Sequence, residues 1–193
     1  MAGKLEGRMI AVLATDGVEQ VELVECRKAL DQEGAITRLV SIKAGEIQGM
    51  NHLDKADTFP VDATIEEVDN GGLQALFVPG GAVNPDTLRM DPAAVDFVRW
   101  FYDHDKPIAA ICHAPWMLVE ADVVRRMTVT SWPSLQTDIR NAGGTWVDEQ
   151  VVNDHGVVTS RKPDDIPAFN EEMIEQFQVG RIKGRHKSEV APL

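Results

Sequence analysis

The chain has 193 residues, of which 44% are hydrophobic, and it carries 31 acidic against 19 basic residues for a formal charge of −12. This size and composition predict one compact domain with one substantial core, and the negative surface argues against nucleic acid as the main partner because it would repel phosphate backbones. Every apolar run falls far short of the ~20 residues of a membrane-spanning helix, so no membrane anchor is predicted.

The first half of the chain alternates strand and helix patterns. A continuous apolar run at 9–14, ended by the turn residues TDG, predicts a strand buried on both faces. The segment 18–34 has apolar residues at helical spacing and a terminal glycine, which predicts a helix. Residues 35–42 form a second predicted strand and complete a right-handed βαβ unit. The segment 45–68 has no helical period and predicts short strands and connections, and the next buried strand, in 73–81, ends at the sequence VPGG.

The alternation continues in the middle of the chain. A helix is predicted within 90–107, where Asp91 is placed to cap it and Pro92 takes its first position. The buried strand PIAAI follows at 107–111 and leads directly into Cys112. Strand and helix patterns also fill the remainder of the domain: a helix at 114–121, a strand at 127–132, a helix at 134–144, strands around a turn at 145–161 and a helix at 162–178.

Strands that alternate with helices predict an α/β layer fold with a mostly parallel sheet. Residues 1–180 are expected to form this single domain, and the basic, aperiodic segment 181–193 is expected to be a flexible tail. In such sheets, binding sites lie at the carboxyl ends of the strands. Three predicted strand ends carry polar or glycine-rich turns, with the sequences TDGVEQVE, VPGGAVNPD and ICHAPW.

Two cysteines bear on the compartment and on metal binding. The apolar stretch at the amino terminus is too short for a secretory signal, so the chain is predicted to stay in the reducing cytoplasm with Cys26 and Cys112 as free thiols. The sequence has no CxxC pair and no histidine cluster at ligand spacing, so neither a metal nor another cofactor is predicted. Cys26 lies in the middle of a predicted helix on its apolar face and is interpreted as a core residue.

Cys112 admits two interpretations from the residues alone. A strand followed at once by this cysteine and by a helix that begins near Pro115 has the layout of a nucleophile elbow, which exposes the nucleophile and turns backbone N–H groups toward an oxyanion. The helix dipole would favour its thiolate. The alternative is a small buried hydrophobic residue, which is what a free cysteine commonly is. At this point both stay open.

The polar residues near the other strand ends have the same double interpretation. His113 either takes the thiol proton, if a carboxylate orients its ring, or only caps the helix. Glu19 and Glu22 lie three residues apart on one helix face and complement the helix dipole, or Glu19 leans toward Cys112 and, with a raised pKa, donates a hydrogen bond to it. The glycines of VPGG either only turn the chain or let a backbone N–H approach a substrate oxygen.

Taken in order, these motifs resemble the ThiJ/PfpI superfamily, and within it the PfpI-type intracellular proteases and stress proteins also described as deglycases. The resemblance extends over nearly the whole predicted domain and is carried by the segments IAVLATDGVEQVEL, ALFVPGGAVNPDTLR, KPIAAICHAPWML, TSWPSLQTDIRNAGGTWVDEQVV and VVTSRKPDDIPAFNEEMIE. It implies a flavodoxin-like three-layer sandwich of the class I glutamine amidotransferase type. That amidotransferase activity itself is rejected, because the chain has TSRKPDD where those enzymes have a His-x-Glu pair.

The resemblance also implies roles for single residues. It makes Cys112 the nucleophile with His113 beside it, and Glu19 the carboxyl that hydrogen-bonds the cysteine. It makes Asp86 the acid that reaches the histidine of a neighbouring subunit, so that the site is completed only in a homo-oligomer, a dimer or larger. The oxyanion-binding and substrate-binding positions are then Gly81, with Gly80 before it, and the backbone of His113.

Two residues depart from the family pattern. Ala114 stands where the family commonly has glycine after the Cys-His pair, which predicts less space at the turn. Trp116 places a large ring near the predicted mouth of the site, where it would narrow the access of a substrate.

The leading hypothesis is a cysteine-dependent hydrolase that acts as a deglycase or glyoxalase-like enzyme on carbonyl-derived adducts, whether small molecules or adducts on proteins. An intracellular cysteine peptidase is the alternative within the enzymes. From a different class come a stress chaperone or a redox sensor in which Cys112 is oxidised, and a binding protein with an inactive site.

Overall fold

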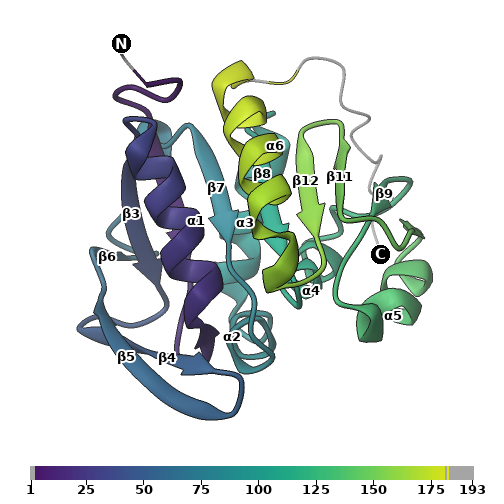
Figure 1. The fold of residues 1–193 in the computed structure, drawn as a ribbon, viewed down its shortest axis with the longest axis horizontal. Coiled ribbons are helices and arrows are strands. Elements are labelled where there is room, and N and C mark those ends of the chain that lie inside the picture. Colours follow the sequence, from purple (N-terminus) through teal and green to yellow (C-terminus); the bar gives the residue numbers. More distant parts are fainter. Residues whose placement is uncertain (1–2, 181, 183–193) are drawn as a thin grey trace.

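The computed structural model describes residues 3–180 and 182, and Figure 1 shows a central sheet with helices on both faces. The tail predicted for 181–193 lies, apart from Ile182, outside the described residues. The predicted α/β fold with a mostly parallel sheet is confirmed. In the described part of the chain, no helix combines the length and the apolar character that a bilayer crossing requires.

Seven strands form the central sheet, and every neighbouring pair is parallel except the hairpin at one edge, β11 with β12. Because β1, β7 and β8 are adjacent and parallel, their carboxyl ends meet at one edge of the sheet. In spatial order the strands are β11 (Val151–Asp154), β12 (Val157–Ser160), β8 (Ile108–Ile111), β7 (Ala75–Val78), β1 (Met9–Leu13), β3 (Ile36–Ser41) and β6 (Ala63–Thr64).

Helices bury apolar residues against each face of this sheet, which makes three layers. One face packs against α1 (Gln20–Gln32) and α6 (Ile166–Val179), which lie side by side in front of the sheet in Figure 1. The other face packs against α2 (Val83–Leu88), α3 (Pro92–Asp103), α4 (Pro115–Glu120) and α5 (Gln136–Asn141).

The buried strands explain why their sequences are apolar without interruption. In β1, Ile10 and Val12 pack in the cluster under α1 and α6, whereas Ala11 and Leu13 pack in the cluster on the opposite face. Successive side chains of a strand point to opposite faces, so a strand covered on both sides has no position left for a polar residue.

Smaller elements surround the main sheet. One three-stranded sheet comprises β2 (Val18–Glu19), β4 (Glu46–Asn51) and β5 (Asp54–Pro60), and one two-stranded sheet comprises β9 (Thr128–Val129) and β10 (Thr145–Trp146). Short 3₁₀ helices occupy Asn70–Gly72, Pro133–Leu135 and Pro163–Asp165.

Three predicted elements differ from the structure. The first helix begins at Gln20 rather than at residue 18, because Val18 and Glu19 pair with β4 as a strand. The strand predicted at 127–132 is reduced to β9, which lies outside the main sheet. The helix α2 was predicted as part of a turn. The predicted cap of α3 is confirmed, since the Asp91 side chain accepts from the first free N–H groups of that helix.

Candidate active site

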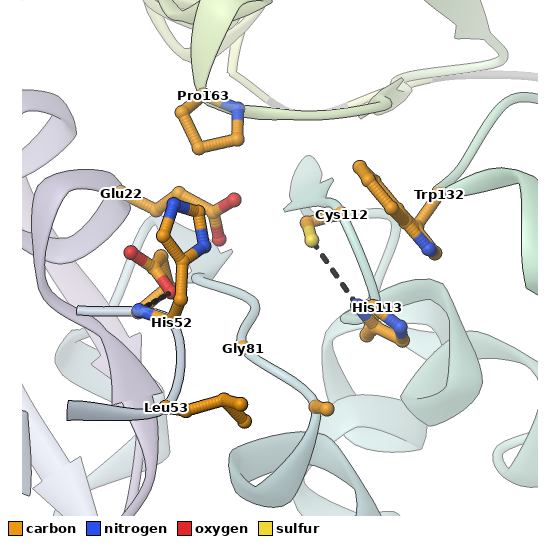
Figure 2. A pocket seen from close by; sticks show the side chains of 10 residues that line it. Glu22, His52, Leu53, Gly81, Cys112, His113, Trp132 and Pro163 are labelled. Carbon is orange, nitrogen blue, oxygen red and sulfur yellow. Dashed lines mark hydrogen bonds between the residues drawn. The ribbon is translucent and has the colours of Figure 1, made fainter. Parts of the chain in front are cut away.

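A pocket of about 230 Å³ lies at the carboxyl edge of the central sheet, where the predicted strand ends meet. Figure 2 shows Cys112, His113 and Trp132 on one side of it, and Glu22 and His52 on the other. The described residues contain no group of three or more His, Cys, Asp and Glu side chains placed to bind a metal ion. The lining comprises Glu19, Glu22, His52, Leu53, Gly81, Ala82, Cys112, His113, Trp132 and Pro163.

Cys112 occupies a sharp turn between β8 and α4. Its φ of 64° lies in the left-handed region, which side chains other than glycine rarely adopt and which costs on the order of 1–2 kcal/mol. Two backbone hydrogen bonds hold it there: its N–H donates to Ser160 at 3.0 Å, and its carbonyl accepts from Trp132 at 2.8 Å. Cys112 is 7% exposed and lines the pocket. Strain maintained at a pocket-lining thiol indicates a functional position.

The carboxyl that contacts this thiol belongs to Glu22. Its side chain is fully buried, its Oε2 accepts the backbone N–H of Gly80 at 2.8 Å, and the carboxyl interacts with the Cys112 thiol. Burial raises the pKa of Glu22 to about 8, although its interactions with the Gly80 N–H and with Cys112 oppose the shift. At neutral pH this carboxyl is therefore mostly protonated and is able to donate a hydrogen bond to the sulfur.

The contact with Cys112 that the sequence assigned to Glu19 is thus made by Glu22, and that prediction is wrong. The cause is the start of the first helix. Glu19 lies in β2, and its Oε2 accepts the backbone N–H of His52 at 3.2 Å, whereas Glu22 lies in the first turn of α1. Glu19 nevertheless lines the same pocket.

Opposing influences act on the Cys112 thiol. Burial raises its pKa, and Glu22 raises it further through its negative charge when ionised and through its side-chain interaction with the thiol. The backbone N–H groups of Gly81 and His113 hydrogen-bond the sulfur and lower the pKa. These two N–H groups are thus placed to stabilise negative charge in the pocket.

The His113 imidazole lies beside the thiol, with its Nδ1 at 3.2 Å from the Cys112 sulfur. Burial lowers the pKa of this histidine, which favours the neutral ring at neutral pH. The ring packs against Trp132 at 5.8 Å and Trp116 at 5.4 Å between centroids. Within the described residues no carboxylate contacts the imidazole, so its orientation comes from the two indole rings.

The two glycines after β7 have different roles. Gly81 has a φ of 85°, and a Cβ there would lie 2.5 Å from the backbone oxygen of Gly17, so only glycine fits. This close approach brings the Gly81 N–H to the Cys112 sulfur. Gly80 does not supply the predicted oxyanion donor, because its N–H is bonded to Glu22.

Tryptophan lines the pocket at a different position from the one predicted. Trp132, which is 39% exposed, is part of the lining, whereas Trp116 is not. The indole N–H of Trp116 donates to Asp138 at 2.8 Å, and the ring supports His113 from outside the pocket. The missed Trp132 is the last residue of the predicted strand 127–132, so its place at the end of a strand was the available signal.

Asp86 and Ala114 also lie away from the pocket. Asp86 is in the first turn of α2 with an exposed side chain, and its action on a neighbouring subunit remains a prediction. Ala114 is fully buried in the core cluster under α3 and α4, so its methyl group does not reduce the space of the pocket.

His52 and Leu53 were not predicted as site residues. They lie at the tip of the hairpin formed by β4 and β5, which reaches the pocket because β4 pairs with β2 beside Glu19. Leu53 is 94% exposed, and His52 has a φ of 57°. The turn sequence NHLD was the local signal of a hairpin, but its position over the pocket depends on the β2–β4 pairing.

Comparisons with known proteins found one matching family model and several similar proteins. A family model described as the DJ-1/PfpI family matches residues 8–176. "Putative cysteine protease YraA" of Bacillus subtilis is 36% identical over 167 residues, covering 86% of this chain and 96% of the relative. "Protein/nucleic acid deglycase 2" of Escherichia coli is 38% identical over 168 residues, covering 86% and 96%. "General stress protein 18" of Bacillus subtilis is 38% identical over 170 residues, covering 87% and 96%.

A solved structure shows the same architecture. Drosophila melanogaster DJ-1beta superposes with a TM-score of 0.81 at 22% identity, covering 89% of this chain and 91% of that one. At that identity the likeness concerns the fold, which is the three-layer arrangement described above.

Proposed function

The chain belongs to the DJ-1/PfpI family, and from this premise we propose that it is a cysteine-dependent hydrolase that removes carbonyl-derived adducts from amine-bearing or thiol-bearing molecules. The observation that carries the proposal is the pairing of Cys112 with Glu22 in a pocket that also presents the N–H groups of Gly81 and His113. The names of relatives as deglycases support the reaction class.

In the proposed mechanism, the proton of the Cys112 thiol passes to Nδ1 of His113, the nearest base at 3.2 Å. Burial lowers the pKa of His113 and keeps its ring neutral, so the nitrogen is free to accept. The protonated carboxyl of Glu22 and the two backbone N–H groups then hydrogen-bond the thiolate. These donors offset the cost of placing a negative charge in a buried site.

The thiolate next attacks the electrophilic carbon of the adduct. Its electron pair forms the S–C bond, and the π pair of the carbonyl moves to oxygen. The N–H groups of Gly81 and His113, which no longer face a charged sulfur, stabilise this oxyanion. His113 gives its proton to this oxyanion, which leaves a hemithioacetal on Cys112. It then carries the proton of the hydroxyl on the neighbouring carbon to the departing amine or thiol, as the O–H pair forms a C=O bond and the C–N or C–S pair leaves with that group. The hemithioacetal finally collapses, which restores the Cys112 thiol and releases the dicarbonyl to be hydrated by water.

The size of the pocket supports a small substrate. Its volume of about 230 Å³ lies below the roughly 300–1,000 Å³ of pockets that enclose drug-sized ligands. A two- or three-carbon carbonyl fragment attached to a side chain fits this space better than an extended ligand. A peptidase, as in the name of YraA, would use the same thiol on an acyl carbon, and it is the competing assignment.

The test compares both reactions in the same variants. Purified protein is given glyoxal-modified N-acetyl-lysine, with release of the free amine as the readout, and in parallel a fluorogenic peptide and a thermally aggregating protein. Cys112→Ser is expected to abolish amine release, while Cys26→Ala, which removes the other buried thiol, retains it. Amine release that survives in Cys112→Ser contradicts the assignment of Cys112 as the nucleophile. Cleavage of the peptide alone favours a peptidase, and suppression of aggregation alone favours a chaperone.

A further inference from the structure

The pocket contains a second buried carboxyl, that of Glu19, which the proposed mechanism does not use. Glu19 is 7% exposed and lines the pocket together with Cys112. One of its oxygens, Oε2, accepts the backbone N–H of His52 at 3.2 Å. The other, Oε1, is buried and has no hydrogen-bond partner among the residues that the structure describes. Oε1 of Glu22 is likewise buried without a hydrogen-bond partner among the described residues, but that carboxyl interacts with the Cys112 thiol.

The Glu19 carboxyl is held in place on both sides. Its backbone pairs with Met50 of β4, and its own N–H donates to the carbonyl of Gly80 at 3.3 Å. The hairpin tip at His52 then fixes one carboxyl oxygen. The Glu19 carboxyl is therefore a fixed part of the wall of a small pocket rather than the end of a mobile side chain.

A buried acceptor without a partner is unfavourable, and a ligand that brings a donor to it gains binding free energy that an analogue without the donor does not. The pocket holds about 230 Å³, so this donor must belong to the same small fragment that Cys112 attacks. Resting on the proposed role of Cys112, we propose that Glu19 is a substrate-binding residue that selects substrates with a hydroxyl or amine hydrogen adjacent to the electrophilic carbon.

The selection is measurable with two-carbon aldehydes that differ in one group: acetaldehyde, glycolaldehyde with an added hydroxyl, and freshly deprotected aminoacetaldehyde with an added amine. Each adds reversibly to Cys112, since the sulfur pair forms an S–C bond and the carbonyl oxygen takes a proton, giving a hemithioacetal without any redox change. Occupied Cys112 resists alkylation by iodoacetamide. The readout is the aldehyde concentration that halves the alkylation rate of the Cys112 peptide, determined by mass spectrometry and divided by the corresponding value for a free thiol in solution.

The variants test the role of the unpartnered oxygen Oε1 of Glu19. In Glu19→Gln, the amide oxygen can keep the bond to His52 and the amide NH₂ then replaces the free acceptor with a donor. Glu25→Gln is the matched control, because it removes the same charge from an exposed position of α1 outside the pocket. Far-ultraviolet circular dichroism verifies the fold of each protein.

The wild-type protein and Glu25→Gln are expected to prefer glycolaldehyde or aminoacetaldehyde over acetaldehyde by about 10- to 100-fold, and Glu19→Gln is expected to lose this preference. The aldehyde that is preferred identifies the donor as hydroxyl or amine. Equal protection by all three aldehydes, no protection by any, or a preference that persists in Glu19→Gln overturns the proposal. Adduct hydrolysis is not needed for this readout, so a failure of the proposed function alone leaves the aldehyde preference intact.

Discussion

The backbone N–H of Gly80 donates to the buried carboxyl of Glu22 at 2.8 Å, which joins the loop after β7 to the first turn of α1. The same carboxyl interacts with the Cys112 thiol. A single side chain therefore positions the glycine turn and the thiol relative to each other. Substitutions of Glu22 separate these effects, because glutamine preserves an acceptor and a donor while alanine preserves neither.

We predict that Glu22→Gln leaves the alkylation rate of Cys112 by iodoacetamide at pH 7 within about threefold of wild type, since its amide donates to the thiolate as the protonated carboxyl does. Glu22→Ala is expected to slow alkylation by about 10- to 100-fold, because a hydrogen bond to the charged sulfur is lost. The measurement is the initial rate on folded protein between pH 6 and 9. Equal rates in Glu22→Ala and wild type would show that Glu22 does not support the thiolate.

The stability of the protein is predicted to fall as pH rises through the range in which Glu22 ionises. Burial raises the pKa of Glu22 from 4.5 to about 8 in the folded chain, so between these values the folded state binds more protons than the unfolded state. The free energy of unfolding then decreases with rising pH, by up to about 5 kcal/mol from this group. Urea unfolding at pH 5 and 8 measures it, and Glu22→Gln, which cannot ionise, should show a shallower decrease. Parallel profiles in the two proteins would contradict the raised pKa.

The structure confirms the strands and turns around the site that local sequence determines. The run PIAAI forms the buried strand β8, and Cys112 follows it at the turn into α4, because strand burial and the proline in the first helical turn are both encoded nearby. Gly81 was identified because VPGG ends a buried strand.

The parts that failed depend on contacts between distant segments. Glu19 and Glu22 lie on one face of the predicted helix. In the structure, Val18 and Glu19 instead pair with β4, about 30 residues later in the chain, so the helix begins only at Gln20 and Glu22 is the carboxyl beside the thiol. His52 reaches the pocket through the same pairing. Local periodicity contains no information on such a strand addition.

His113 is predicted to act as the proton carrier of the reaction. His113→Ala should reduce kcat for amine release by about 10²- to 10⁴-fold with little change in KM, because the backbone N–H of residue 113 stays in place. Burial lowers the pKa of this histidine, so kcat of the wild-type protein should fall with decreasing pH at a pKa below the ordinary histidine value near 6.5. This acid limb of the pH profile of kcat should be absent in the variant. His104→Ala, at an exposed position, is the control. A retained acid limb in His113→Ala would assign the proton transfer to another group.

Asp86 is predicted to act only within an oligomer, since it is exposed on α2 and absent from the pocket lining of its own chain. Asp86→Asn should then lower activity without changing the free energy of unfolding by more than about 0.5 kcal/mol, as is usual for an exposed position. Sedimentation of the wild-type protein is measured at the assay concentration. A strict monomer, or full activity in Asp86→Asn, would remove Asp86 from the mechanism.

Gly81 is predicted to be irreplaceable for both stability and thiol reactivity, and Gly45 provides a matched control. Both have left-handed backbones, with φ of 85° and 90°, but a Cβ at Gly81 would lie 2.5 Å from the backbone oxygen of Gly17, whereas none of the described atoms lies within 4 Å of a Cβ at Gly45. Gly45→Ala should therefore cost only the backbone strain of about 1–2 kcal/mol, and Gly81→Ala about 1–3 kcal/mol more from overpacking.

The clash at Gly81 also has a functional consequence. Relieving it must move the loop after β7 away from Gly17, and this displaces the N–H group that hydrogen-bonds the Cys112 sulfur. Alkylation of Cys112 should accordingly slow in folded Gly81→Ala and remain unchanged in Gly45→Ala. Urea unfolding and iodoacetamide kinetics on the two variants check both parts. If the two alanines destabilise the protein equally and leave Cys112 equally reactive, then the backbone conformation alone explains Gly81, and its N–H is not a donor to the site.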